Sequence, residues 1–177
     1  LKAGKDVLHV ALSSGISGTY NSACTARDEI ASEFPDRRVV VVDSLAASSG
    51  YGLLMDKLAE LRRAGMDLDG LAAWAEAHRR EVQHWFFSSD LTFFIRGGRI
   101  SKTAGFFGNM LKICPVMDVE LDGSLAVREK VRTKRRAERR VLELMRELAQ
   151  GGDGYGGKVF ISNSACLDDA RTVSDRI

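Results

Sequence analysis

The spacing of apolar and polar positions changes character partway along the chain. In the first part, continuous apolar runs are typical of strands buried in a parallel sheet, and each is followed by a segment with helical periodicity. The expected strands are 7–12 and 39–42, and the expected helices are 19–33, 45–64 and one capped by Asp69 that ends near His84. This alternation indicates a parallel sheet with helices on its faces.

Beyond about residue 80 the pattern changes to hairpins and short helices. Asp122-Gly123 stands between two strand-like segments, which is a strong signal for an antiparallel hairpin. The expected strands are 82–87, 114–121, 125–132 and 158–163, and the expected helices are 91–95, 103–111, 134–150 and one from Leu167 onward. We therefore predict an α/β plus α+β chain. Part of a parallel-sheet α/β/α domain covers 1–80, and part of an α+β domain with an antiparallel sheet and helices covers 81–177.

A loop rich in serine and glycine follows the first predicted strand and precedes the first helix. Its residues Ser13, Ser14 and Ser17 supply hydroxyls, and its glycines permit a close approach of the backbone to a ligand. The N-terminus of the following helix adds free amides and the positive end of its dipole, which favours an anion. The same residues also fit a tight turn with serine caps, and the loop alone does not decide between the two. It matches neither a Walker loop nor a Gly-x-Ser-x-Gly elbow.

A second candidate motif is Arg96-Gly-Gly-Arg-Ile-Ser101, which places two guanidiniums around a backbone that can fold tightly. Arginine suits a carboxylate or a phosphate, and it also satisfies helix C-terminal carbonyls beside a glycine. Most of the eight phenylalanines lie close by in the sequence, at Phe86, Phe87, Phe93, Phe94, Phe106 and Phe107. Clustered aromatics are usually core, but an apolar ligand tail beside an anionic head needs the same lining.

Charge and composition narrow the classes of function. A formal net charge of +2 gives no indication of nucleic-acid binding. The segment 130–140 is nevertheless strongly basic, and it is either a docking face for an acidic partner or a solvated helix. The three cysteines show no metal or disulfide spacing, and no apolar run reaches the ~20 residues of a membrane span. We expect a reducing, cytoplasmic setting with no metal, cofactor or nucleic-acid partner.

Signals for catalysis are weak. His9, His78 and His84 have no serine or cysteine partner at a diagnostic spacing. On the residues alone, three other classes of function stay open besides a binding protein for an anion with an apolar tail. They are a serine-dependent acyl hydrolase or transferase, a phosphate or nucleotide binder in which Asp43 contacts a ribose, and a pure interaction module.

Several segments, taken together and in order, resemble the DegV family of bacterial fatty-acid-binding proteins. They are Leu12–Ala23, Val42-Asp-Ser44, Arg96–Ser101, Gly105–Lys112 and Lys130-Val-Arg132. The resemblance implies a two-domain protein that holds one long-chain fatty acid such as palmitate or oleate, with its carboxylate between the domains and its tail buried. It also implies a carrier that is not an enzyme. The carrier presents the acid to a fatty-acid kinase for acyl-phosphate formation and phospholipid synthesis, with at most transient proximity to a membrane.

The resemblance also assigns roles to individual residues. Ser14, assisted by Ser13 and Ser17, is expected to bind the carboxylate together with Arg99. The expected tail-lining residues are Phe93, Phe94, Phe106 and Phe107, and the expected kinase contacts are Lys130 and Arg132. The family's N-terminal Asp-Ser strand, its Thr-Ser loop and its C-terminal His-x-Gly-Pro-Gly segment are absent from this sequence. We therefore expect a middle piece of a DegV protein that by itself binds lipid weakly or not at all.

Overall fold

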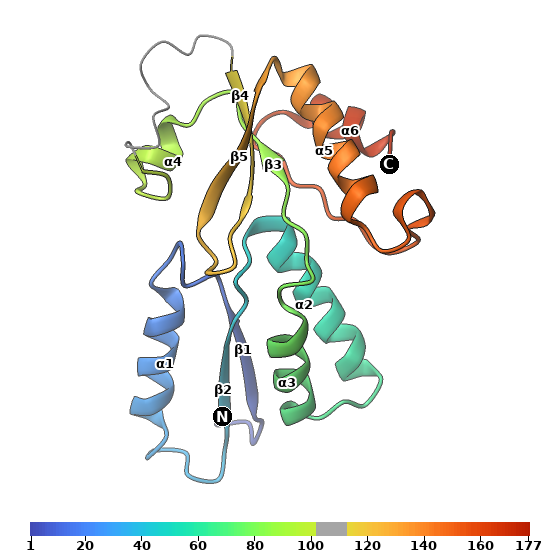
Figure 1. The fold of residues 1–177 in the computed structure, drawn as a ribbon. Coiled ribbons are helices and arrows are strands. Elements are labelled where there is room, and N and C mark those ends of the chain that lie inside the picture. Colours follow the sequence, from blue (N-terminus) through green and yellow to red (C-terminus); the bar gives the residue numbers. More distant parts are fainter. Residues whose placement is uncertain (102–112) are drawn as a thin grey trace. The chain divides into compact units, whose positions relative to one another are not determined.

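The computed structural model describes residues 1–101 and 113–177, which form two compact units (Figure 1). The first unit comprises Leu1–Val82 and Leu121–Ser124, and the second comprises Gln83–Glu120 and Leu125–Ile177. The segment 121–124 is the tip of the predicted hairpin, so a short piece that is distant in sequence completes the first unit. The helix predicted over 103–111, with Phe106 and Phe107, lies outside the described residues.

The first unit is built on two parallel strands, β1 (Val7–Ala11) and β2 (Val39–Asp43), which pair from Val7 opposite Val39 to Ala11 opposite Asp43. Figure 1 shows α1 (Thr19–Ile30) on one side of these strands and α2 (Ser48–Arg63) and α3 (Leu68–His78) on the other. The core of this unit consists of Val10, Val42, Leu54, Leu58, Leu71 and Ala75. The predicted parallel sheet with helices is confirmed.

Several helix boundaries in the first unit differ from prediction, and α1 ends at Ile30 instead of near residue 33. The helix expected from residue 45 begins at Ser48, because Leu45 and Ser48 both have φ of +48° and the backbone turns sharply between them. The cap of α3 is Asp67, whose carboxylate accepts a hydrogen bond from the Gly70 amide at 2.8 Å. Asp69, the predicted cap, pairs with Arg38 instead. The helix ends at His78 and does not extend to His84.

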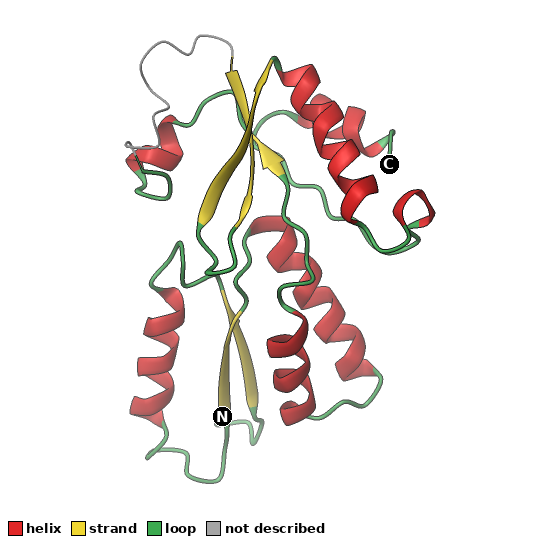
Figure 2. Cartoon of the chain, in the orientation of Figure 1, coloured by secondary structure: helices red, strands yellow, loops and turns green. Residues whose placement is uncertain are grey.

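The second unit contains an antiparallel sheet in the order β3 (Phe86–Phe87), β4 (Ile113–Val119) and β5 (Leu125–Arg132) (Figure 2). A short helix, α4 (Thr92–Arg96), follows β3. The longer α5 (Lys134–Leu148) follows β5, and a 3-10 turn (Gly152–Gly154) and α6 (Leu167–Ser174) complete the unit. The predicted hairpin and amphipathic helix are confirmed.

The two faces of this sheet bury different clusters. On one face, Cys114 and Val116 pack against Ala137 and Leu144 of α5. On the other, Met117 packs with Leu91 and Ile100, and half-buried Phe86 and Phe94 lie against them. The cores of the two faces are therefore separate, as expected for a strand whose successive side chains alternate.

The strand predicted over 158–163 is wrong. The segment belongs to neither described sheet, and Val159, Phe160 and Ile161 are each 40% exposed. An apolar β-branched run favours an extended backbone, but a strand also requires a neighbour that takes up its hydrogen bonds. The strand predicted over 82–87 is likewise reduced to Phe86–Phe87, the two residues that pair with β4. None of the helices in the described ranges is long and apolar enough to cross a membrane.

Candidate functional site

The serine-rich loop lies at the carboxyl ends of the two parallel strands. Parallel pairing brings Ala11, where β1 ends, beside Asp43, where β2 ends. Asp43 is 8% exposed, and its Oδ1 accepts hydrogen bonds from the Ser14 amide at 3.1 Å and the Leu45 amide at 3.0 Å. One carboxylate therefore joins the loop after β1 to the turn after β2. This is the edge at which open parallel sheets bind ligands.

Ser13 holds this loop against the hairpin tip. Its side chain is fully buried, its hydroxyl donates to the Gly123 carbonyl at 2.7 Å, and its Oγ accepts from the Gly15 amide at 3.2 Å. Its backbone amide donates to Ala46. The single proton of the hydroxyl is thus already committed to a backbone carbonyl, although a role for Ser13 in anion binding stays a prediction.

Two glycines make this contact possible. A Cβ on Gly15 would lie 2.4 Å from the carbonyl carbon of Gly123, and a Cβ on Gly123 would lie 2.1 Å from the Ser13 Oγ. Gly123 also has φ of +82°, a conformation that favours glycine. The close approach of the two loops therefore depends on both residues lacking a side chain.

Ser14 and Ser17 have different surroundings from Ser13. Ser14 is exposed, and within the described residues its hydroxyl forms no hydrogen bond. The Ser17 Oγ accepts from the Thr19 amide at 3.3 Å. The following helix α1 begins at Thr19, its N-cap residue Gly18 provides no side-chain cap, and its first turn contains no acidic residue. A hydroxyl without a partner among the described residues and the positive dipole end of α1 therefore belong to the same loop, and both favour an anion.

Two further side chains near this loop, Arg79 and Tyr20, interact with Asp43. Arg79 donates from its guanidinium to the main-chain oxygen of Asp43 at 2.6 Å and also pairs with Glu76 at 2.8 Å, so a cation lies beside the buried carboxylate. A hydrogen bond with Cys24 raises the pKa of Tyr20, in the first turn of α1, and the nearby charge of Asp43 contributes to the same shift. The Tyr20 phenol therefore stays protonated near neutral pH and is a hydrogen-bond donor.

The arginine–glycine motif lies in the second unit, at the end of α4. Gly98 has φ of +74°, the Arg99 amide donates to the Phe94 carbonyl at 2.8 Å, and the exposed Arg99 guanidinium donates to the Gly97 carbonyl. The helix-capping interpretation of this motif is therefore realised in the structure. Whether Arg99 also binds an anion stays a prediction.

The aromatic side chains predicted to line a tail have unequal environments. Phe94 is half-buried and packs into the cluster around Met117, with the Phe86 ring 6.1 Å from its own. Phe93 is 76% exposed. Phe94 thus belongs to the core of the second unit, while Phe93 presents an apolar ring to its surroundings.

The basic segment 130–140 does not form one surface. Lys130 and Arg132 are exposed on β5 and lie two residues apart, so they share a face of the sheet. Val131 pairs with Cys114 and contacts the α5 cluster, so its two neighbours lie on the opposite face. The cations on β5 are therefore separated from those on α5.

The described residues contain no group of histidine, cysteine and acidic side chains that could hold a metal ion. His78 pairs with Glu81 at 2.9 Å and stacks on Trp74, so these interactions account for its position on α3. The Ser13 hydroxyl donates to a carbonyl and not to a histidine. The Ser13 hydroxyl therefore does not share its proton with a histidine base.

Comparison with known sequences identifies relatives along the full length of the chain. A family model described as "Uncharacterised protein, DegV family COG1307" matches residues 1–177. A DegV domain-containing protein of Clostridium perfringens is 33% identical over 178 residues, which cover 100% of this chain and 60% of that protein. One from Lactococcus lactis is 40% identical over 141 residues, covering 80% of this chain and 49% of the relative. The chain thus spans about half to three fifths of the length of these relatives.

Solved structures share its fold. A fatty-acid-binding DegV family protein from Thermus thermophilus is 34% identical and superposes with a TM-score of 0.68 over 83% of this chain and 50% of its own. A DegV family protein from Eubacterium eligens, loaded with heptadecanoic acid, is 22% identical and has a TM-score of 0.86 over 97% of this chain and 60% of its own. The Streptococcus pneumoniae fatty acid kinase B3 protein, loaded with linoleic acid, is 23% identical with a TM-score of 0.85 over the same shares.

Proposed function

Since the chain belongs to the DegV family, we propose that it is the part of a fatty-acid carrier that binds the carboxylate through the loop at 12–18. The observation that carries this proposal is the exposed Ser14 hydroxyl, which has no hydrogen-bond partner among the described residues and follows a buried clamp at Ser13. Support also comes from the Thermus thermophilus relative, which is named for binding fatty acid.

Each residue of the loop then has a distinct task. Ser13 fixes the loop, the Ser14 hydroxyl donates to the carboxylate, Ser17 holds the start of α1 through the Thr19 amide, and the first turn of α1 adds positive potential. Arg99 is the cation of the second unit that the family resemblance assigns to the same network. A carboxylate removed from water without such partners would cost several kcal/mol.

The acyl chain supplies most of the affinity in this proposal. Each buried CH2 contributes about 0.8 kcal/mol, so a long chain is held tightly without a covalent bond. Phe93, exposed in the second unit, is the first of the predicted tail-lining residues to test. A carrier of this kind needs no nucleophile, which agrees with the commitment of the Ser13 proton to Gly123.

The proposal extends to presentation of the bound acid to a fatty-acid kinase in the cytoplasm, for acyl-phosphate formation. Its support is the exposed pair Lys130 and Arg132 on one face of β5. An Arg132→Ala variant is expected to keep its fatty acid but to lower acyl-phosphate formation with a kinase. Arg63→Ala, which removes an exposed cation at the end of α2, is the matched control.

Native mass spectrometry of the protein as purified from the cells that produce it, followed by lipid extraction, tests the binding step. The wild type is expected to carry a long-chain fatty acid. Ser14→Ala is expected to lower affinity for added oleate by about 10- to 100-fold, the value of one hydrogen bond to a charged group. Ser22→Ala removes another exposed serine hydroxyl, farther along α1, and should have no effect. Equal oleate binding by the Ser14→Ala and Ser22→Ala variants would show that the carboxylate lies elsewhere.

A further inference from the structure

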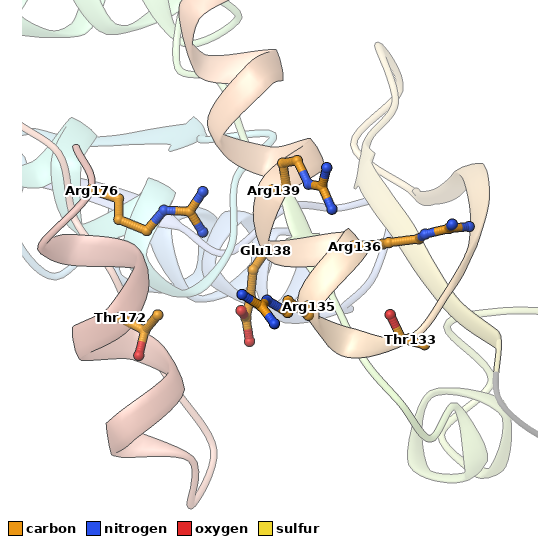
Figure 3. A pocket seen from close by; sticks show the side chains of 7 residues that line it. All are labelled: Thr133, Arg135, Arg136, Glu138, Arg139, Thr172 and Arg176. Atoms are coloured by element: carbon orange, nitrogen blue, oxygen red, sulfur yellow. The ribbon is translucent and has the colours of Figure 1, made fainter.

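A groove that is separate from the serine loop lies in the second unit between the start of α5 and the end of α6 (Figure 3). Its volume is about 750 Å³, and it is lined by Thr133, Arg135, Arg136, Glu138, Arg139, Thr172 and Arg176. Lys134 of α5 forms an ion pair with Asp169 of α6, which ties the two helices together at this point. Neither the fatty-acid proposal nor the pair Lys130 and Arg132 uses this groove.

The arginines of the groove are distinguished by their lack of partners. Arg140, one turn from Arg136 on the same helix, is held by Glu129 and Glu147 at 2.8 Å each. By contrast, the four groove arginines form no ion pair or side-chain hydrogen bond within the described parts of the chain; they are Arg135, Arg136, Arg139 and Arg176. Glu138, 7% exposed, is the one acidic residue among the lining residues. Four arginines and one glutamate line the groove, so the charges of its lining do not balance.

The geometry adds further donors. Figure 3 shows Arg176 reaching from the end of α6 toward α5, with Arg135 and Glu138 between the two helices. The 15-residue helix α5 begins at Lys134, the side chain of its N-cap residue Thr133 does not cap it, and its first turn contains no acidic residue. Its positive dipole end is therefore open beside the arginines. Thr133 and Thr172 add two hydroxyls to the lining.

We propose that this α5–α6 groove binds the phosphate group of a small phosphorylated molecule or of a lipid headgroup. Planar guanidinium forks, hydroxyls and a helix N-terminus are the donors that phosphate oxygens prefer. The groove has the volume of a small-molecule site, whereas docking of an acidic protein segment needs a far larger surface. Phosphate binding in this groove requires no fatty acid. The two proposals can therefore be tested independently of each other.

Calorimetric titration of the full chain with inorganic phosphate and pyrophosphate, in chloride buffer, is the direct test. Flotation with phosphatidylcholine vesicles, with and without phosphatidylglycerol, detects a lipid source. Arg135→Gln and Arg176→Gln are each expected to weaken binding by about tenfold or more, the value of a charge-assisted hydrogen bond. Glu138→Gln is expected to strengthen it, because it removes the opposing charge without changing shape. Arg146→Gln is the matched control, since it lies on α5 outside the groove and pairs with Asp153.

The pattern across variants decides the outcome. If pyrophosphate binds, and binds more weakly to the arginine variants but more strongly to Glu138→Gln, the ligand is a free phosphorylated molecule. If these effects are seen only with phosphatidylglycerol vesicles, the ligand is a lipid headgroup. The proposal is overturned if neither probe binds, if Arg146→Gln weakens binding as much as Arg176→Gln, or if Glu138→Gln fails to strengthen it. Binding of polyglutamate without pyrophosphate binding would overturn it in favour of a protein-docking surface. Thermal melts of each variant show whether it is folded. If an arginine variant does not fold, Glu138→Gln still tests whether the charge of the groove controls phosphate binding.

Discussion

Replacing Ser13 by alanine removes one buried hydroxyl. The change tests the structural role of Ser13 in the serine loop separately from the ligand-binding role proposed for Ser14. The change leaves the Gly123 carbonyl without its donor at 2.7 Å and the Gly15 amide without its acceptor at 3.2 Å. Gly123 is buried, so its unsatisfied carbonyl costs about 1–3 kcal/mol. Gly15 is exposed, so water replaces most of the second hydrogen bond and the loss is about 0.5–1 kcal/mol.

The expected destabilisation of the first unit is therefore about 1.5–4 kcal/mol. Denaturation followed by tryptophan fluorescence measures it cleanly. The chain has two tryptophans, Trp74 in the first unit and Trp85 in the second, so a Trp85→Phe background reports on the first unit alone. This background also avoids treating two units as a single two-state transition.

Ser14→Ala is the matched control for this measurement. Its hydroxyl is exposed and has no partner among the described residues, so stability should change by less than about 0.5 kcal/mol. The affinity for oleate is expected to fall more in the Ser14→Ala variant than in the Ser13→Ala variant, the opposite of the effect on stability. If Ser13→Ala is as stable as Ser14→Ala, the buried hydroxyl does not clamp the hairpin tip and the division of roles proposed for the loop is wrong.

Three further predictions follow from single contacts. Gly15→Ala places a Cβ 2.4 Å from the backbone of Gly123, and urea denaturation should show a loss of about 1–3 kcal/mol; an unchanged midpoint would mean that the two loops do not meet. Arg140→Ala breaks the network with three glutamates and should cost about 1 kcal/mol, whereas Arg139→Ala on the same helix should be near neutral, and equal losses would contradict this difference. Burial raises the pKa of the Cys114 thiol to about 11, so at pH 8 a thiol reagent should label Cys114 only after unfolding. Because this pKa is higher in the folded than in the unfolded state, the contribution of the thiol to stability is retained below about pH 9 and is lost as the pH rises toward 11. The Cys114→Ala variant should therefore lose less stability than the wild type over that pH range.

Local sequence determined most of the secondary structure. The apolar runs that became β1 and β2, the Asp122-Gly123 turn and the periodicity of α5 each act over a few residues, so a pattern reveals them directly. The composition of the serine loop was also visible, because residue type and order are local properties. The family resemblance was also carried by short segments, among them Leu12–Ala23 and Arg96–Ser101, and the match of the DegV family model over 1–177 confirms it.

Tertiary structure decided which of these residues are used and how. Three neighbouring serines look equivalent in sequence, yet only contact with Gly123, 110 positions away, commits the Ser13 hydroxyl to the fold and leaves that of Ser14 free of partners among the described residues. The same holds for the cations of α5, since acidic groups on β5 and on the last turn of α5 engage Arg140 and leave Arg139 in an unneutralised groove.

The apolar segment 158–163 shows that a local pattern alone does not determine a strand. Its composition predicted a strand, but a strand is a relation between two backbones, and neither described sheet pairs with it. Hydrogen bonding, burial and charge compensation all depend on what lies opposite a residue. Short-range pattern therefore determined the elements of this protein, while long-range contacts determined which hydroxyls and guanidiniums are available to a ligand.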